Sequence, residues 1–138
     1  MTGTLVGRRR ALAGPLAVLG GLGAGVLLVA VVDPHEPGHY PTCPSLALTG
    51  LYCPGCGGLR MVNSLAHGDV GAAFGHNQLA FLMLGVGAYV LGRWTYSAAV
   101  GRPMRTVLSR PAVLVSMLAV AVVFAVVRNL PFAAVLAP

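Results

Sequence analysis

The residues of this chain that are able to do chemistry are its three cysteines, which lie close together in the sequence. Cys53 and Cys56 form a CxxC pair, and Cys43 precedes them by a short segment. A helical pattern begins just after Cys56, so we expect the pair at a helix N-terminus. The helix dipole and free N–H groups at such a position favour the thiolate, which is the form that attacks disulfides and binds metals.

This arrangement of cysteines is typical of two kinds of functional site, a thiol-redox site and a metal site. In a thiol-redox carrier, Cys53 is the exposed nucleophile, Cys56 is the resolving thiol, and Cys43 is a third exchange partner. In a metal site, the three thiolates and one histidine form a closed tetrahedral Cys3His zinc site, or the thiolates bind copper(I). The histidines available for that role are His35, His39, His67 and His76.

The third interpretation is a structural disulfide from Cys43 to Cys53 or Cys56. Such a bond closes a loop of about a dozen residues and typically contributes about 3 kcal/mol in the chain-entropy model. It would staple the loop and leave one cysteine free or buried in lipid. Residue spacing alone leaves all three interpretations open.

The segment from about 57 to 67 follows a helical repeat and predicts a short amphipathic helix on the outer leaflet. Arg60, Asn63, Ser64 and His67 share one polar stripe of this helix. An arginine near bilayer depth needs an anionic partner, for which Asp69, a cysteine thiolate and a lipid phosphate are the candidates.

A set of short motifs around the cysteines carries a family resemblance. Its residues are Cys43, Cys53, Pro54, Cys56, Gly57, Arg60, Gly68, Asp69 and Asn77. Together they resemble a bacterial membrane-protein family, the domain of unknown function 2752, over roughly residues 43 to 84. Members commonly have proline after the asparagine that matches Asn77, where this chain has Gln78. The resemblance implies a membrane location and singles out the cysteine motif, and it implies no activity.

The remainder of the chain predicts membrane-spanning helices. Hydrophobic residues make up 57% of the sequence and charged residues only 9%, whereas a soluble domain has about a quarter charged residues. We therefore expect an all-α integral membrane protein with three transmembrane helices and a short interfacial amphipathic helix between the first and second. The predicted segments are a basic N-terminus (1–10), helix 1 (11–32), the cysteine-motif loop (33–76), helix 2 (77–100), a basic loop (101–110), helix 3 (111–128) and an interfacial tail (129–138).

The arginines indicate how these segments are oriented. The positive-inside rule favours a cytoplasmic N-terminus, a cysteine loop outside the cell and an inner-membrane location. Only Arg60 and Arg128 then lie outside, while the arginines placed inside are Arg8, Arg9, Arg10, Arg93, Arg102, Arg105 and Arg110. The net charge of +6 is therefore explained by topology and anionic lipid, and we expect no nucleic-acid partner.

Glycines in the first and second helices suggest close packing, either within the protein or against a partner. They are Gly20, Gly21, Gly23, Gly25, Gly85 and Gly87.

The motifs of hydrolases and phosphoryl-transfer enzymes do not occur in the sequence. We therefore favour a non-catalytic accessory protein, whose cysteine-stapled loop docks a membrane-protein partner or a second copy. The redox alternative uses Cys53, Cys56 and Cys43. The metal alternative takes zinc or copper as cofactor on Cys43, Cys53, Cys56 and His67.

Overall fold

The computed structural model describes residues 2–104 and 106–137, and these residues form helices and loops without a strand. Arg105 and the side chains of Arg8 and Arg9 lie outside the described parts of the chain. The all-α prediction is confirmed for the described residues. The helices are α1 (Thr2–Val31), α2 (Pro44–Thr49), α3 (Gly58–Ala66), α4 (Val70–His76), α5 (Gln78–Val100) and α6 (Pro111–Val127), with the 3-10 turns η1 (Val107–Ser109) and η2 (Pro131–Leu136).

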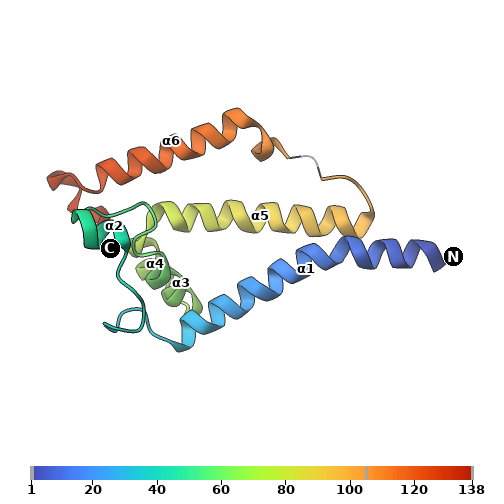
Figure 1. The fold of residues 1–138 in the computed structure, drawn as a ribbon, viewed down its shortest axis with the longest axis horizontal. Coiled ribbons are helices and arrows are strands. Elements are labelled where there is room, and N and C mark those ends of the chain that lie inside the picture. Colours follow the sequence, from blue (N-terminus) through green and yellow to red (C-terminus); the bar gives the residue numbers. More distant parts are fainter. Residues whose placement is uncertain (1, 105, 138) are drawn as a thin grey trace.

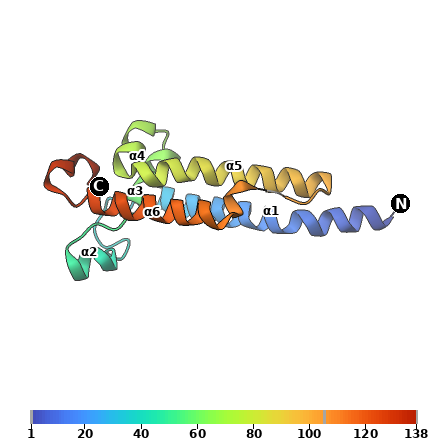
Figure 2. The same ribbon diagram turned by 90° about the horizontal axis from the view of Figure 1, so that it is seen from above.

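The long helices α1, α5 and α6 extend along the long axis of the molecule, and the short helices α2, α3 and α4 gather at one end (Figures 1 and 2). The C-terminus lies at this end and the N-terminus at the other. The cysteine segment and the residues after α6 therefore meet, although they are far apart in the sequence.

Two helices are long and apolar enough to cross a membrane, over Arg10–Val31 and Gln78–Val100. The third apolar helix, α6, has 17 residues and a length of about 26 Å. The structure thus supports two of the three predicted spans by length and composition, and the third stays a prediction.

Two boundaries differ from the predicted ones. The helix that contains the first predicted span begins earlier, at Thr2, because no proline precedes Pro15 and the arginines are good helix formers. Its candidate membrane span, Arg10–Val31, agrees with the predicted 11–32. The segment between Cys43 and Cys53 was expected to be loop, and it forms α2. Pro44 suits the first turn of that helix, and Gly50 ends it with a φ of 71°.

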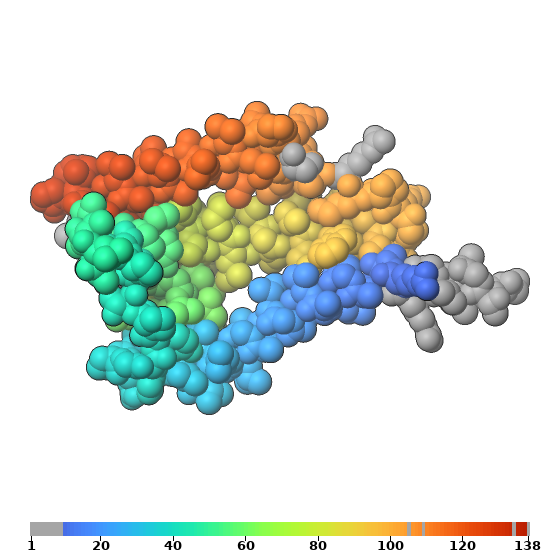
Figure 3. Space-filling view, in the orientation of Figure 1, coloured from blue at the N-terminus to red at the C-terminus, as the bar shows by residue number. Residues whose placement is uncertain are grey.

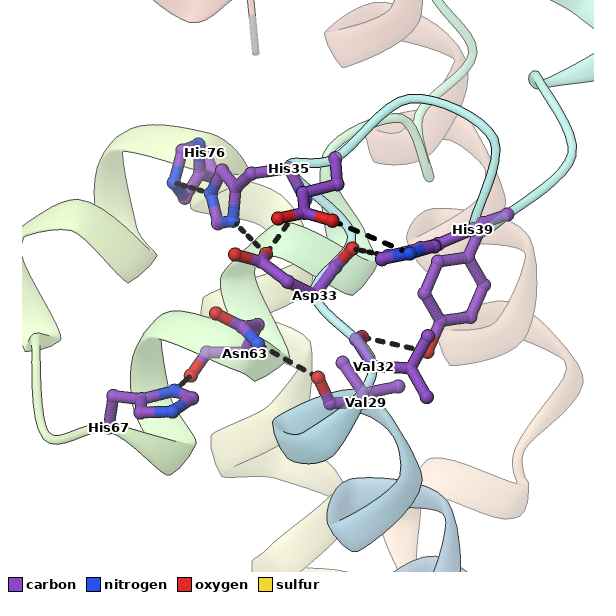
Figure 4. Close-up of polar contacts among 10 residues, drawn as sticks. Val29, Val32, Asp33, His35, His39, Asn63, His67 and His76 are labelled. Carbon is purple, nitrogen blue, oxygen red and sulfur yellow. Dashed lines mark hydrogen bonds and ion pairs between the residues drawn. The ribbon is translucent and has the colours of Figure 1, made fainter.

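A helix is present at the predicted position as α3, and one of its faces is packed against the rest of the fold. It packs on α1 and α4, and Asn63 and Ser64 of the predicted polar stripe are buried. The Asn63 amide donates to the carbonyl oxygen of Val29 at 2.8 Å, as Figure 4 shows. Carbonyls in the last turn of a helix lack intrahelical partners, so a polar residue on α3 is needed at this contact.

The glycines expected to permit close packing do not do so within the described chain. A Cβ atom would meet nothing within 4 Å at Gly20, Gly21, Gly23, Gly25, Gly85 and Gly87. The close approach is instead at Gly14, where a Cβ atom would lie 3.0 Å from the ring of Trp94. α1 therefore contacts α5 near Gly14.

Candidate thiolate site

The three cysteine sulfurs meet at one point, although they come from two segments. Cys43 precedes the first turn of α2, and Cys53 and Cys56 flank the turn before α3. The Sγ atoms of Cys43 and Cys53 are 3.3 Å apart, and those of Cys53 and Cys56 are 3.1 Å apart. All three sulfurs lie within 4.8 Å of one another. The three cysteines of the motif therefore form one cluster in the structure.

The backbone around the cluster supplies N–H groups to the sulfurs. The backbone N–H of Cys53 donates to the Sγ atom of Cys56 at 3.3 Å. Gly57 follows with a φ of 84°, a backbone conformation that favours glycine. This conformation turns the chain from the CxxC segment directly into α3, which explains the glycine of the motif.

The pKa values of Cys43 and Cys56, whose sulfurs lie on either side of Cys53, are shifted in opposite directions by their surroundings. The backbone N–H of Leu46, followed by the Cys53 and Cys56 thiols, lowers the pKa of Cys43 to about 7. Burial, followed by the neighbouring thiols, raises the pKa of Cys56 to about 12. The sequence predicted helix-terminal thiolate character for the CxxC pair, but the thiol that begins a helix and becomes acidic is Cys43.

Asn77 holds the CxxC turn from the side of α5. Its side chain is fully buried, and its amide group donates to the carbonyl oxygens of Pro54 and Cys56, both at 2.9 Å. Its own carbonyl oxygen accepts the Ala80 N–H at 2.8 Å and so caps α5. One side chain thereby fixes both the turn and the start of a long helix.

Arg128 holds the same turn from the end of α6. It is 2% exposed, and one guanidinium nitrogen donates to the carbonyl oxygens of Cys53 and Cys56 at 2.9 and 3.2 Å. A second nitrogen donates to the carbonyl of Leu136 at 3.0 Å, so the C-terminal tail folds over the arginine. Among the described residues no carboxylate pairs with this buried cation.

Asn129 completes the attachment of α6 to the cysteine loop. Its side-chain oxygen accepts the backbone N–H of Tyr52 at 2.8 Å, and its amide nitrogen donates to the Tyr52 carbonyl at 2.9 Å. The Tyr52 ring lies 5.7 Å from the Arg128 guanidinium carbon, within the range of a cation–π contact. The site is thus built from the CxxC turn, the start of α5 and the end of α6.

This combination of cysteine motif and supporting asparagine agrees with the comparison to known families. The family model described as "Protein of unknown function (DUF2752)" matches residues 43–91. This part of the chain is therefore similar to the DUF2752 family, and we refer to residues 43–91 as the DUF2752 region. The match confirms the resemblance predicted from the motif. No curated protein and no solved structure matches the chain significantly.

The DUF2752 region contains the three cysteines and Asn77, but not the residues that close the site from α6. Its Gly68 has a φ of 82°, and its Asp69 caps α4 by accepting the Ala72 N–H at 2.8 Å. Arg60 is half-exposed and makes no hydrogen bond or ion pair within the described chain. The arginine that contacts the cysteine turn is Arg128.

His67 does not join the sulfurs of the DUF2752 motif. Its Nδ1 atom lies 2.9 Å from the carbonyl oxygen of Asn63 (Figure 4). His67 follows the last residue of α3, whereas the cysteines precede its first residue. In the described part of the chain, the group of residues that could hold a metal ion around the sulfurs contains the cysteines alone. The predicted Cys3His set is therefore reduced to three thiols.

Arg128 and Asn129 were missed from the sequence because they lie more than seventy positions from the cysteines they support. Their one local signal is their place at the end of an apolar helix. An arginine at such a place is equally typical of one that only sets membrane topology. Asn77 was found through the motif, but spacing did not reveal that its amide spans the turn.

Proposed function

We propose that this chain is a polytopic membrane protein whose thiols Cys43, Cys53 and Cys56 bind a soft metal ion, Zn²⁺ or Cu⁺. The observation that carries the proposal is the convergence of three sulfurs from two segments to within 4.8 Å. A structural disulfide needs two sulfurs and gives the third no reason to be there. Thiolates are the ligands that select Cu⁺ and Zn²⁺ among the common metals.

The residues present fit such an ion. Thiolates bound to one tetrahedral zinc lie about 3.8 Å apart, and the observed sulfur contacts of 3.1 and 3.3 Å need only a small expansion. Three thiolates on a divalent ion carry one net negative charge. The Arg128 guanidinium donates hydrogen bonds to the backbone of two of the ligands and has no carboxylate partner among the described residues. It supplies the opposite charge.

A bound ion would tie the start of α2 to the CxxC turn, which is the role first expected of a disulfide staple. An accessory function, in which the held loop faces a membrane partner or a second copy, therefore remains part of the proposal. The metal supplies structural cross-linking, and the protein supplies a turn already held by Asn77 and Arg128.

We also propose the three-span topology with the cysteines outside the cytoplasm of an inner membrane. The length of α6, about 26 Å, falls at the short end of transmembrane helices. Support comes from the arrangement of the chain, in which the start of α1, the end of α5 and the start of α6 lie at one end of the molecule (Figure 1). Arg10, Arg93, Arg102 and Arg110 belong to these parts of the sequence, as the positive-inside rule requires.

Thiol exchange is the second candidate, and the order of the sulfurs favours it. Cys53 lies between the other two, so a Cys43 thiolate is placed to attack Cys53 in a Cys53–Cys56 disulfide. A Cys43–Cys53 bond would form as the first bond breaks, and Cys56 would leave as a thiolate. A disulfide-bonded partner protein would have to supply the initial oxidation. The pKa of about 12 makes Cys56 a poor leaving group, so we rank exchange below metal binding.

The experiment is native mass spectrometry of untagged protein in detergent, combined with alkylation without reductant. A metal site predicts a bound Zn²⁺ or Cu⁺ and three thiols that react only after chelation. A Cys43→Ser variant should lose the ion, while Ser45→Ala on the same short helix should keep it. A metal-free chain lacking two hydrogens, with one reactive thiol, would instead establish a disulfide.

A further inference from the structure

Two histidines outside the cysteine cluster face each other across the surface of the cysteine-motif loop. His35 lies in the segment after α1, and His76 is the last residue of α4. Their Nε2 atoms are 3.3 Å apart, and Figure 4 shows the two rings meeting tip to tip. We propose that His35 and His76 form a second metal site, which binds a divalent ion of the Zn²⁺ or Cu²⁺ type through these two nitrogens.

The spacing of the nitrogens suits a shared ion. Two imidazole ligands at about 2.0–2.1 Å from a tetrahedral ion have nitrogens about 3.4 Å apart. The observed separation is 3.3 Å, and the ring centroids are 5.1 Å apart with an interplanar angle of 55°. The two rings therefore need little movement to direct both lone pairs at one ion. The remaining ligand positions face solvent, since His35 is exposed.

Asp33 fixes the tautomer of the His35 ring. Its Oδ1 atom accepts from the backbone N–H of His35 at 2.8 Å and lies 2.7 Å from the ring Nδ1 atom. A carboxylate oxygen in this position accepts the ring N–H. The proton of a neutral His35 ring must then be on Nδ1, and Nε2 presents its lone pair to His76. In metal sites of this kind, a ligating histidine commonly donates its other ring N–H to a carboxylate, which orients the ring.

Charged groups from neighbouring elements face His76. They are Arg60 on α3 and Asp69 before α4, together with the His35 ring. Arg60 repels an incoming cation, and the carboxylates of Asp33 and Asp69 oppose that repulsion.

The site is independent of the proposed thiolate centre because no cysteine belongs to it. It has a structural consequence, however, since His76 directly precedes Asn77, whose amide holds the CxxC turn. An ion between His35 and His76 would join the loop after α1 to the end of α4, beside that asparagine.

The test is Zn²⁺ binding to the untagged full chain in detergent, counted by native mass spectrometry. In the Cys43→Ser, Cys53→Ser, Cys56→Ser triple variant we expect one bound ion. Adding His35→Ala or His76→Ala should remove it, and adding His67→Ala, whose ring bonds to its own helix, should not. Asp33→Asn should weaken binding by about tenfold or more.

A second measurement covers the case in which the triple variant does not fold. In the chain with intact cysteines, His76→Ala should lower the zinc count by one without changing the number of thiols that chelation releases. Cu²⁺ bound to the triple variant should show nitrogen hyperfine structure in its electron paramagnetic resonance spectrum. Equal zinc binding by the His76→Ala and His67→Ala variants would overturn the second site and leave the thiolate site untouched.

Discussion

Different forces hold together two regions of the molecule. The cysteine end comprises the cysteine segment with α2, α3, α4 and the residues after α6, and the shafts are the parts of α1, α5 and α6 that extend away from it. At the cysteine end, residues 52–56 receive hydrogen bonds from Asn77, Arg128 and Asn129. Along the shafts, α1 diverges from α5 (Figure 3), and a groove of about 630 Å³ separates α5 from α6. Apolar side chains there are open, as in Leu118, which is 66% exposed.

This difference indicates which part of the fold the chain specifies by itself. Buried polar groups are costly unless they are hydrogen-bonded. The hydrogen bonds from Asn77, Arg128 and Asn129, which we call the clamp, therefore select a single arrangement of the cysteine turn. The shafts bury little apolar surface against one another, so their exposed apolar side chains suit the lipid surroundings that we propose. Substitutions at the cysteine end should therefore have large and local effects, and substitutions on the shafts should have small ones.

Removal of Arg128 should have the largest effect. Arg128→Met removes three hydrogen bonds, to the carbonyl oxygens of Cys53, Cys56 and Leu136. We expect a loss of about 3 kcal/mol in the free energy of unfolding, because each bond has a charged donor. The measurement is thermal or denaturant unfolding in one detergent, with alkylation of Cys56 as a local probe.

Arg60→Gln is the matched control, because Arg60 has no hydrogen bond or ion pair in the described chain. It should change stability by no more than about 0.5 kcal/mol. Similar losses in the two variants would show that Arg128 does not hold the cysteine turn.

Asn77 allows the clamp to be separated from the helix cap. Asn77→Ala removes both and should cost about 2 kcal/mol. Asn77→Asp keeps an oxygen to cap α5 but loses the amide that donates to Pro54 and Cys56. If the hydrogen bonds to the turn dominate, the free energy of unfolding of Asn77→Asp should equal that of Asn77→Ala. If the helix cap dominates, it should equal that of the unmodified chain. Only the first result agrees with a turn held by Asn77.

Thiol reactivity against pH sharpens the contrast inside the cysteine end. The pKa of Cys43 is lowered to about 7, so its thiolate is present above that pH and is lost below it. The pKa of Cys56 is raised to about 12, so it stays protonated across the accessible range. After chelation, alkylation followed by peptide mass spectrometry should give a midpoint near pH 7 for Cys43 and little reaction at Cys56. Midpoints that coincide for the two thiols would contradict the different environments.

The shafts should give the smallest effect. A Cβ atom at Gly14 would meet the Trp94 ring at 3.0 Å, whereas one at Gly20 would meet nothing within 4 Å. Gly14→Ala should lower stability by up to about 1 kcal/mol, and Gly20→Ala should leave it unchanged or raise it slightly. The two variants are compared by melting temperature in the same detergent. The reverse order would show that α1 is packed through its glycine-rich face.

How far the sequence predicts this molecule differs between the same two regions. Composition and apolar runs predicted the long helices, because length and hydropathy are local properties. The cysteine cluster and Asn77 were found through a compact motif. Arg128, Asn129 and the acidity of Cys43 were not, because each depends on a contact between distant segments or on the unexpected helix α2.

The most direct test of the thiolate centre is X-ray absorption spectroscopy at the metal edge, on protein purified from membranes without reductant. The His76→Ala variant is the appropriate sample, because it removes the imidazole site from the signal. A thiolate centre predicts a first shell dominated by three sulfur atoms at about 2.3 Å. A shell of nitrogen and oxygen alone, or a metal-free chain that contains a disulfide, would contradict it.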